Sequence, residues 1–142
     1  MKKTILLLLP FFLFSCGATS TKTTVNKTLF EVLTQQSYGG ASIQFYEILT
    51  EPNEIKMLQN DAKLKNKITT NDILTSNFII LNMGEKLTGG FEIGVEGALE
   101  TDKNIIVTIK ETSPEPDAMV SKVISNPYCV VKINSKKEII FK

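Results

Sequence analysis

Hydrophobic and polar positions alternate along much of the second half of the chain. In residues 91–96 and again in residues 104–112, nearly every second side chain is apolar. A period of two residues predicts a β-strand with one buried face and one wet face. The polar stretch 101–104 separates the two strands and predicts a tight hairpin turn. On this pattern Val107 is expected to face the core.

Shorter apolar runs predict further strands elsewhere in the chain. They cover residues 29–33, 43–49, 78–81, 128–133 and 138–141. The last two runs are separated only by the polar residues 134–137, so they are expected to form a closing hairpin.

One segment carries the signals of a helix. Thr50 can cap a helix start, Pro52 suits the first turn, and two nearby glutamates suit the positive end of the helix dipole. Apolar residues follow at helical spacing, so one amphipathic helix is predicted over residues 52–64. Residues 65–76 are polar and are expected to form a turn, with a bend or a short strand near Ile73.

These elements together predict the fold class. Strands follow one another with short turns, which favours antiparallel pairing. We expect a mainly β domain with one helix, arranged as an antiparallel β-sandwich or a partly open barrel, with the helix packed over one end. This β-rich domain is expected to occupy residues 28–142.

The N-terminus has the pattern of a bacterial export signal. A basic start precedes an apolar run, residues 5–14, which is too short to span a membrane as a helix. The run ends in Leu13-Phe14-Ser15-Cys16, which resembles the lipobox of bacterial lipoproteins. We expect residues 1–15 to be removed as a signal peptide and Cys16 to receive palmitate-type acyl chains, because several chains on one residue anchor stably to a membrane. The alternative is a plain signal peptide with an incidental cysteine.

The residues after Cys16 predict a tether. Residues 16–27 are rich in Ser, Thr and Lys and poor in large apolar side chains, which is typical of a flexible linker. The tether would hold the domain off the membrane. Gly17 follows the cysteine with no acidic residue beside it, which favours the outer membrane if the cell has one. The expected location is therefore the cell envelope.

Composition narrows the classes of function. The net charge is +1 and the lysines are scattered, with no arginine, so no nucleic-acid partner is expected. The chain has no histidine, which excludes Ser-His-Asp and Cys-His nucleophile pairs and histidine zinc sites. Carboxylates or lysine could still catalyse a reaction, but no paired-carboxylate motif stands out, and we expect no enzyme activity, cofactor or metal. Cys129 lies in an apolar run and is expected to be a buried small hydrophobe.

Three loops have an unusual composition, and each adjoins a predicted strand end. Their distinctive residues are Thr88, Gly89, Gly90 and Phe91 in the first, Pro114, Glu115 and Pro116 in the second, and Asn126, Pro127 and Tyr128 in the third. The hairpin brings the first two loops to one end of the sheet, and the third joins them if its strand runs antiparallel. These residues are candidates for partner binding. The alternative is stiff turns, in which glycine provides positive φ, proline a rigid strand entry and Tyr128 a core edge.

Taken in order, these loops resemble the C-terminal domain family of PrcB, a subunit of a bacterial surface protease complex. The shared pattern extends over residues 78–133: a strand ending in Gly84, a Thr-Gly-Gly-aromatic turn, a proline-rich loop and a Pro-Tyr strand start. Phe91 stands where the family often has tyrosine, and Asp117 where glycine is common. The resemblance implies a small exported or lipid-anchored domain that partners or stabilises a protease and does not itself catalyse.

Two other functions stay open. Chagasin-type cysteine-protease inhibitors are also small β-sandwiches, and Thr88-Gly89-Gly90-Phe91 and Pro127-Tyr128 echo two of their loops. The middle loop here has prolines in place of glycines, and the third lacks the arginine and tryptophan of that group. This similarity is an analogy of fold, which does not establish function. The other possibility is a structural envelope lipoprotein without any link to a protease.

Overall fold

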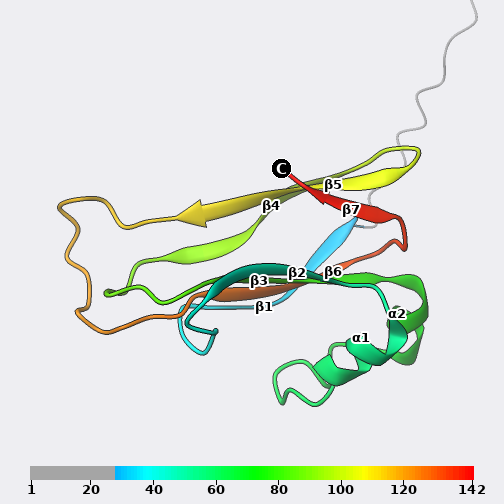
Figure 1. Cartoon of the computed structure of the whole chain (residues 1–142), viewed down its shortest axis with the longest axis horizontal. Helices are drawn as coiled ribbons and strands as arrows, with labels where there is room; N and C mark the ends of the chain where they lie inside the picture. Colours follow the sequence, from blue (N-terminus) through cyan, green and yellow to red (C-terminus); the bar gives the residue numbers. More distant parts are fainter. Residues whose placement is uncertain (1–27) are drawn as a thin grey trace, which may run out of the picture.

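Two β-sheets pack face to face within residues 28–142, the part of the chain that the computed structural model describes (Figure 1). The expected signal peptide (residues 1–15), the lipidation site Cys16 and the tether (residues 16–27) lie outside the described residues. The strands are β1 (Phe30–Gln36), β2 (Gln44–Leu49), β3 (Asn77–Met83), β4 (Glu92–Glu100), β5 (Asn104–Thr112), β6 (Tyr128–Ile133) and β7 (Glu138–Phe141). All seven predicted strand regions are confirmed, with shifts at their ends.

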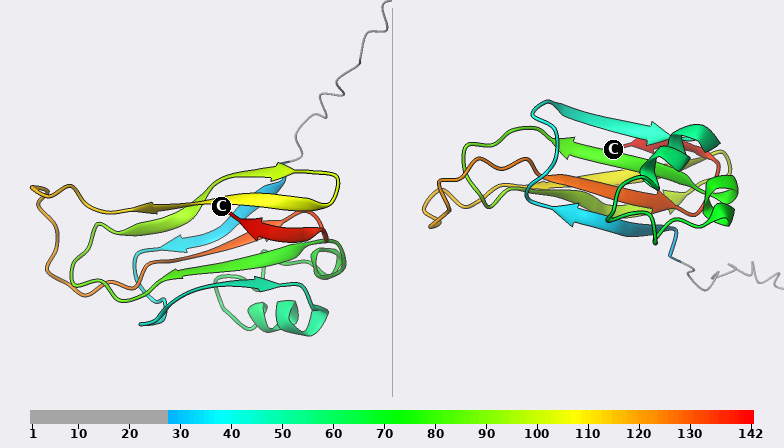
Figure 2. Two further views of the ribbon diagram at one scale, coloured as in Figure 1. Left: turned by 45° about the horizontal axis from the view of Figure 1, so that its top comes forward. Right: turned by 90° about the horizontal axis from the view of Figure 1, so that it is seen from below.

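The larger sheet has four strands in the order β1-β6-β3-β2, and every neighbouring pair is antiparallel. The smaller sheet has the order β4-β5-β7. In it, β4 and β5 form the predicted hairpin, whereas β5 and β7 run parallel. The two sheets form a sandwich and not a closed barrel (Figure 2).

The main core lies between the two sheets. Its fully buried side chains come from β3, β4, β5, β6 and β7, as the alternating pattern requires. Val107 has no exposed surface and faces this core, as predicted. Cys129 is also completely buried there, which confirms its interpretation as a small hydrophobe. Burial raises the pKa of the Cys129 thiol to about 11.

Two helices, α1 (Pro52–Leu58) and α2 (Thr70–Thr75), cover part of the opposite face of the larger sheet (Figure 1). Ile55 and Ile73 point from them into a second apolar cluster, where they pack with Phe78 and Val130 of the sheet. The domain therefore has three layers: the small sheet, the large sheet and the helices. The expectation of a single helix was wrong.

The helix predicted over residues 52–64 ends at Leu58. The chain continues in turns because Asp61 accepts a hydrogen bond from the backbone N–H of Lys63 at 2.7 Å, which competes with helical bonding. Leu64 follows in these turns and is buried in the second apolar cluster, which we call the helix-side cluster.

The second helix replaces the turn and short strand expected in residues 65–76. Thr69 accepts a hydrogen bond from the backbone N–H of Asp72, and the Asp72 carboxylate accepts one from the backbone N–H of Thr69. This capping box satisfies free backbone groups at the helix start and stabilises a helix of only six residues. The Thr-x-x-Asp pattern was the sequence signal for it.

The prediction of a closing hairpin across residues 134–137 was wrong, because β7 does not pair with β6. Strand β6 lies between β1 and β3, so both of its edges are already hydrogen-bonded. The chain therefore crosses to the other sheet, where β7 pairs with β5. The crossing is held in place by the backbone N–H of Asn77, which donates to Ser135 O at 3.0 Å, and by Lys137, whose Nζ donates to Thr101 O at 2.7 Å.

Lys132 connects the helical layer to the large sheet. Its Nζ lies 2.8 Å from a Glu31 carboxylate oxygen on β1 and 3.3 Å from one of Asp72 on α2. Burial opposes the charge of Asp72, but hydrogen bonds from Thr69 and the nearby Lys132 outweigh it and lower the pKa of the Asp72 carboxyl.

Within the described part of the chain, no helix is long and apolar enough to cross a membrane.

Candidate functional site at the loop end

Three loops meet at one end of the sandwich, which we call the loop end: residues 37–43, 84–91 and 113–127 (Figure 1). The second and third are joined as a short antiparallel bridge. Lys86 N donates to Ser125 O at 2.8 Å, and Ser125 N donates to Lys86 O at 2.9 Å. The loop end therefore has a backbone held by tertiary hydrogen bonds.

The glycine turn lies against the proline-rich loop, as expected from the hairpin. Gly89 is buried, and its N–H donates to Ser121 O at 2.9 Å. Gly90 has a φ of 88°, and a Cβ built on it would lie 3.1 Å from the Cβ of Pro114. Both the positive φ and the close approach require glycine at residue 90. Glycine at residue 90 therefore has a structural role, in agreement with the alternative that these loops are stiff turns.

Ser125 is a central contact of the loop end that the sequence analysis missed. Its side chain is completely buried, and its Oγ donates to Thr88 O at 2.6 Å. Serine in a polar loop carries no sequence signal for burial. Its role depends on a loop that is distant in sequence.

The first loop, residues 37–43, was also missing from the sequence prediction of the site. The buried Asn82 side chain holds it: Asn82 Oδ1 accepts from Ala41 N at 2.9 Å, and Asn82 Nδ2 donates to Ala41 O at 2.9 Å. Gly40 N also donates to Asn126 O at 3.0 Å, and Asn126 N donates to Ser37 O at 3.1 Å. This loop therefore buttresses the start of β6.

The other predicted site residues differ in how accessible they are. Glu115 and Pro116 are exposed, while Pro114 and Phe91 are half-buried. Pro127 is buried, and its carbonyl accepts from Met83 N at 2.9 Å. Pro127 therefore fixes the chain at the start of β6 and does not present a binding surface. Strand β6 lies in the other sheet from β5, but it runs in the opposite direction and starts at the loop end, so the third loop joins the other two as the antiparallel condition required.

Tyr128 lies on the helix side of the large sheet, away from the glycine turn. It is half-buried and packs against the helix-side cluster. Lys63 Nζ donates to its hydroxyl at 3.2 Å and lies 5.6 Å from the ring centroid. This arrangement corresponds to the core-edge alternative for Tyr128.

Exposed apolar side chains gather on two of the interlocked loops. Leu87 is 77% exposed, and Met119, Val123 and Ile124 are each more than half exposed. Exposed apolar side chains that lie on neighbouring loops are a common feature of surfaces that bind other proteins. The sequence signal for this surface was the group of apolar residues within 119–124, which lies in a stretch without strand or helix periodicity.

The loop end lies opposite the end at which the chain enters the domain. Phe30, at the start of β1, pairs with Ile133, whereas Gln36, at its end, pairs with Tyr128 beside the loops. Residues that precede Phe30 therefore join the domain at its far end.

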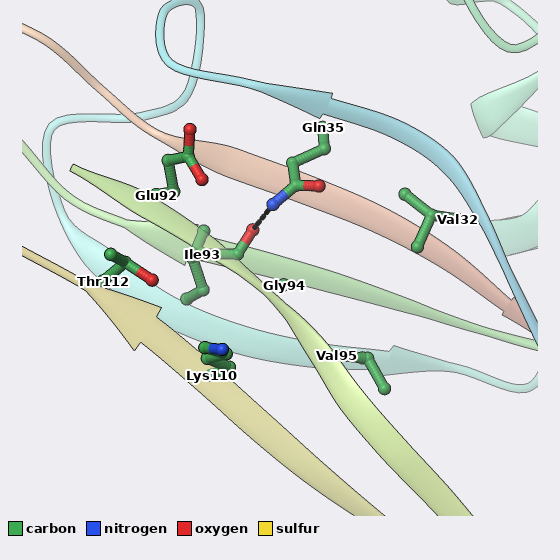
Figure 3. A pocket seen from close by; sticks show the side chains of 8 residues that line it. All are labelled: Val32, Gln35, Glu92, Ile93, Gly94, Val95, Lys110 and Thr112. Atoms are coloured by element: carbon green, nitrogen blue, oxygen red, sulfur yellow. Dashed lines mark hydrogen bonds between the residues drawn. The ribbon is translucent and has the colours of Figure 1, made fainter. Parts of the chain in front are cut away.

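A hollow of about 220 Å³ lies along the side of the sandwich, between β1 and β4 (Figure 3). Gln35 spans it, since its Nε2 donates to Ile93 O at 3.0 Å and so ties the two sheets together. Gly94 leaves room for this amide, because a Cβ there would lie 3.0 Å from Gln35 Nε2. Val32, Val95 and the stems of polar residues line the rest. The hollow is a seam between sheets, bridged by a structural hydrogen bond.

The described residues contain no group of three or more His, Cys, Asp or Glu side chains placed to hold a metal ion. The loop end therefore presents a surface for binding, which consists of a fixed backbone, exposed apolar side chains and a few polar side chains.

A comparison with protein-family models gives a match. The family is described as PrcB C-terminal, and its model covers residues 77–134. This segment runs from the start of β3 to just after β6, so it contains two of the three loops of the loop end and agrees with the region of resemblance. Searches of curated proteins and of solved structures gave no match. Residues 77–134 of this chain are therefore similar to the PrcB C-terminal family.

Proposed function

We propose that this chain is a lipid-anchored, non-enzymatic protein of the cell envelope whose loop end binds a protein partner, and that the partner is a protease or a protease complex. The PrcB C-terminal family suggests association with a protease-related complex.

The single observation that carries the proposal is the set of exposed apolar side chains on hydrogen-bonded loops. Leu87, Val123 and Ile124 are all more than half exposed, and the bridge between Lys86 and Ser125 fixes the backbone that carries them. Loops that are already ordered lose little conformational entropy on binding, so more of the contact energy becomes affinity. Large apolar anchors at the centre of a patch commonly supply most of that energy.

The position of the loop end supports a role away from the membrane. A lipid on Cys16 would attach the chain through residues that enter at Phe30, at the far end of β1 from the loops. The loops would then lie at the opposite end of the domain from the tether, where they are free to contact proteins in the envelope.

The function is tested by affinity purification of the full chain from detergent-solubilised membranes. We expect a protease to be recovered with the tagged chain and identified by mass spectrometry. Untagged cells serve as the control. Recovery of envelope proteins without any protease would favour a structural lipoprotein instead. Suppression of cleavage when the full chain is added to a panel of cysteine proteases would favour an inhibitor.

The anchor is tested with Cys16→Ala. Without the thiol that accepts the lipid, the protein should leave the membrane fraction and appear in the soluble envelope fraction or as an uncut precursor. Cell fractionation followed by immunoblotting measures this. Ser15→Ala, which keeps a small residue before the cysteine, is the control and should stay with the membrane. A wild-type mature N-terminus without lipid, measured by mass spectrometry, would contradict the lipoprotein proposal.

A further inference from the structure

The four edge strands of the two sheets are not equally protected against pairing with another chain. Strand β1 has a register shift between Val32 and Thr34, and β4 has one between Val95 and Gly97. Strand β7 has only four residues. Bulges and short strands are common ways to block addition of a further strand. Strand β2 has neither, since it pairs with β3 in continuous register over all six residues.

The outer edge of β2 is also unoccupied in the described chain. Within residues 28–142, no backbone hydrogen bond connects Gln44–Leu49 to any segment other than β3. Alternate N–H and C=O groups of β2 therefore face solvent, as they do on any edge strand. The strand contains no lysine and no proline, the residues that most often discourage pairing.

An apolar groove adjoins this edge on the helix side. It has a volume of about 260 Å³ and lies between α1 and the strands β2 and β3. The helices cover only one end of the large sheet, which leaves the rest of this face open beside β2 (Figure 2, right). Its lining residues are Glu47, Leu49, Glu54, Met57, Leu58 and Ile80. Met57 is 70% exposed, and Ile80, although on a central strand, is only partly covered.

The charged residues that line the groove are all acidic. Glu47 on β2 and Glu54 on α1 both line it, and no lysine does. Neither carboxylate is engaged in an ion pair within the described residues. A ligand with a cationic side chain next to an apolar one would complement this lining.

We propose that β2 and α1 form a binding site for an extended peptide segment of a partner protein, which adds to the sheet beside β2. Its backbone would pair with the free edge, a large apolar side chain would enter the groove between Met57 and Ile80, and a lysine or arginine would face Glu47 and Glu54. Side chains two residues apart lie on one face of a strand, so the apolar and basic residues should be separated by one residue.

A second copy of this chain is a poorer occupant. Edge-to-edge pairing of two β2 strands would bring the acidic grooves of both copies together, and Glu47 is the only charged residue that β2 could offer to the other groove. Like charges placed opposite each other destabilise strand pairs. The proposal therefore commits to a basic and apolar partner segment. It does not depend on the loop end, which lies on other residues.

The test uses the full chain in detergent and a fluorescein-labelled peptide, Thr-Val-Thr-Leu-Thr-Lys-Thr. Fluorescence anisotropy should show saturable binding. A peptide with glutamate in place of lysine should bind about tenfold more weakly, because attraction becomes repulsion. Glu47→Lys should reverse that preference. Glu47 is exposed, and its side chain makes no hydrogen bond to any of residues 28–142, so the fold should be unaffected, which circular dichroism checks.

The matched control is Glu96→Lys, the same change at an exposed residue of β4, and it should leave the preference for the lysine peptide intact. Amide cross-peaks that shift on titration should belong to β2 and α1. Equal binding of both peptides, or no binding of the lysine peptide, would overturn the proposal. So would a dimer in sedimentation that Glu47→Lys abolishes, because a second copy would then occupy the edge. Peptide binding should persist in variants that lose protease capture through the loop end, which keeps the two proposals separable.

Discussion

Val107→Asp should unfold the domain. Val107 has no exposed surface and lies on β5, the middle strand of the small sheet, in the core between the sheets. An aspartate there would bury a carboxylate without a partner, at a cost of several kcal/mol. The total stability of a small domain is roughly 5–15 kcal/mol, so the loss is comparable with the whole. Loss of the β signal in far-UV circular dichroism at room temperature measures the effect.

The control for this change is the next residue along the strand. Thr108 points to the opposite face of the small sheet, where it lines an open hollow with Gly97 and Leu99. Thr108 is half-buried, and Thr108→Asp places the same carboxylate at this open hollow, where it keeps contact with solvent and costs far less than in the core. It should keep the wild-type spectrum and a nearly unchanged melting temperature. A folded Val107→Asp variant that melts at the wild-type temperature would contradict the assignment of this face to the core.

Leu87→Asp combined with Val123→Lys should abolish recovery of the protease while the domain stays folded. Leu87 and Val123 are 77% and 57% exposed and lie on the two bridged loops. If they are anchors of the interface, placing charges on both should cost about 2 kcal/mol or more each, enough to reduce affinity by more than a hundredfold. The measurement is the amount of protease recovered with the tagged full chain from solubilised membranes.

Two exposed apolar residues elsewhere form the matched control. Leu99 on β4 and Leu74 on α2 are 63% and 67% exposed, and both lie outside the loop end. Leu99→Asp with Leu74→Lys makes the same chemical changes, and it should leave both the melting temperature and the recovery of the protease unchanged. Recovery that survives the loop substitutions in a folded protein would show that the partner binds another surface.

The strands were predictable because their signal is local. In β4 and β5, alternate residues differ in polarity, and burial of one face requires that difference whatever the strand pairs with. The hairpin between them follows from a short polar turn. The grouping of Gly90 with Pro114 then follows from the hairpin, since the first strand starts where the second one ends.

The elements that were predicted wrongly depend on contacts that are distant in sequence. Residues 128–141 have the pattern of a hairpin, but β6 is enclosed by β1 and β3, so β7 has to pair in the other sheet. Helix α2 has only six residues, too few for a periodic pattern, and its capping box and the burial of Ile73 stabilise it. Local propensity could not decide the pairing of β7, whereas α2 had a local signal, its capping box, and depends on the distant core only for the burial of Ile73.

The same division holds for the candidate sites. The amino-acid sequence by itself determined the strands, the turn at Gly90 and the resemblance of residues 77–134 to the PrcB C-terminal family, because each depends on neighbouring residues or on their order. Only the tertiary structure decided that Ser125 is buried beneath Thr88, that Leu87 and Val123 lie on bridged loops, and that β2 is an edge beside an acidic groove. Exposure and edge position are properties of how the strands are ordered in space. That order is set by the packing of segments far apart in the chain.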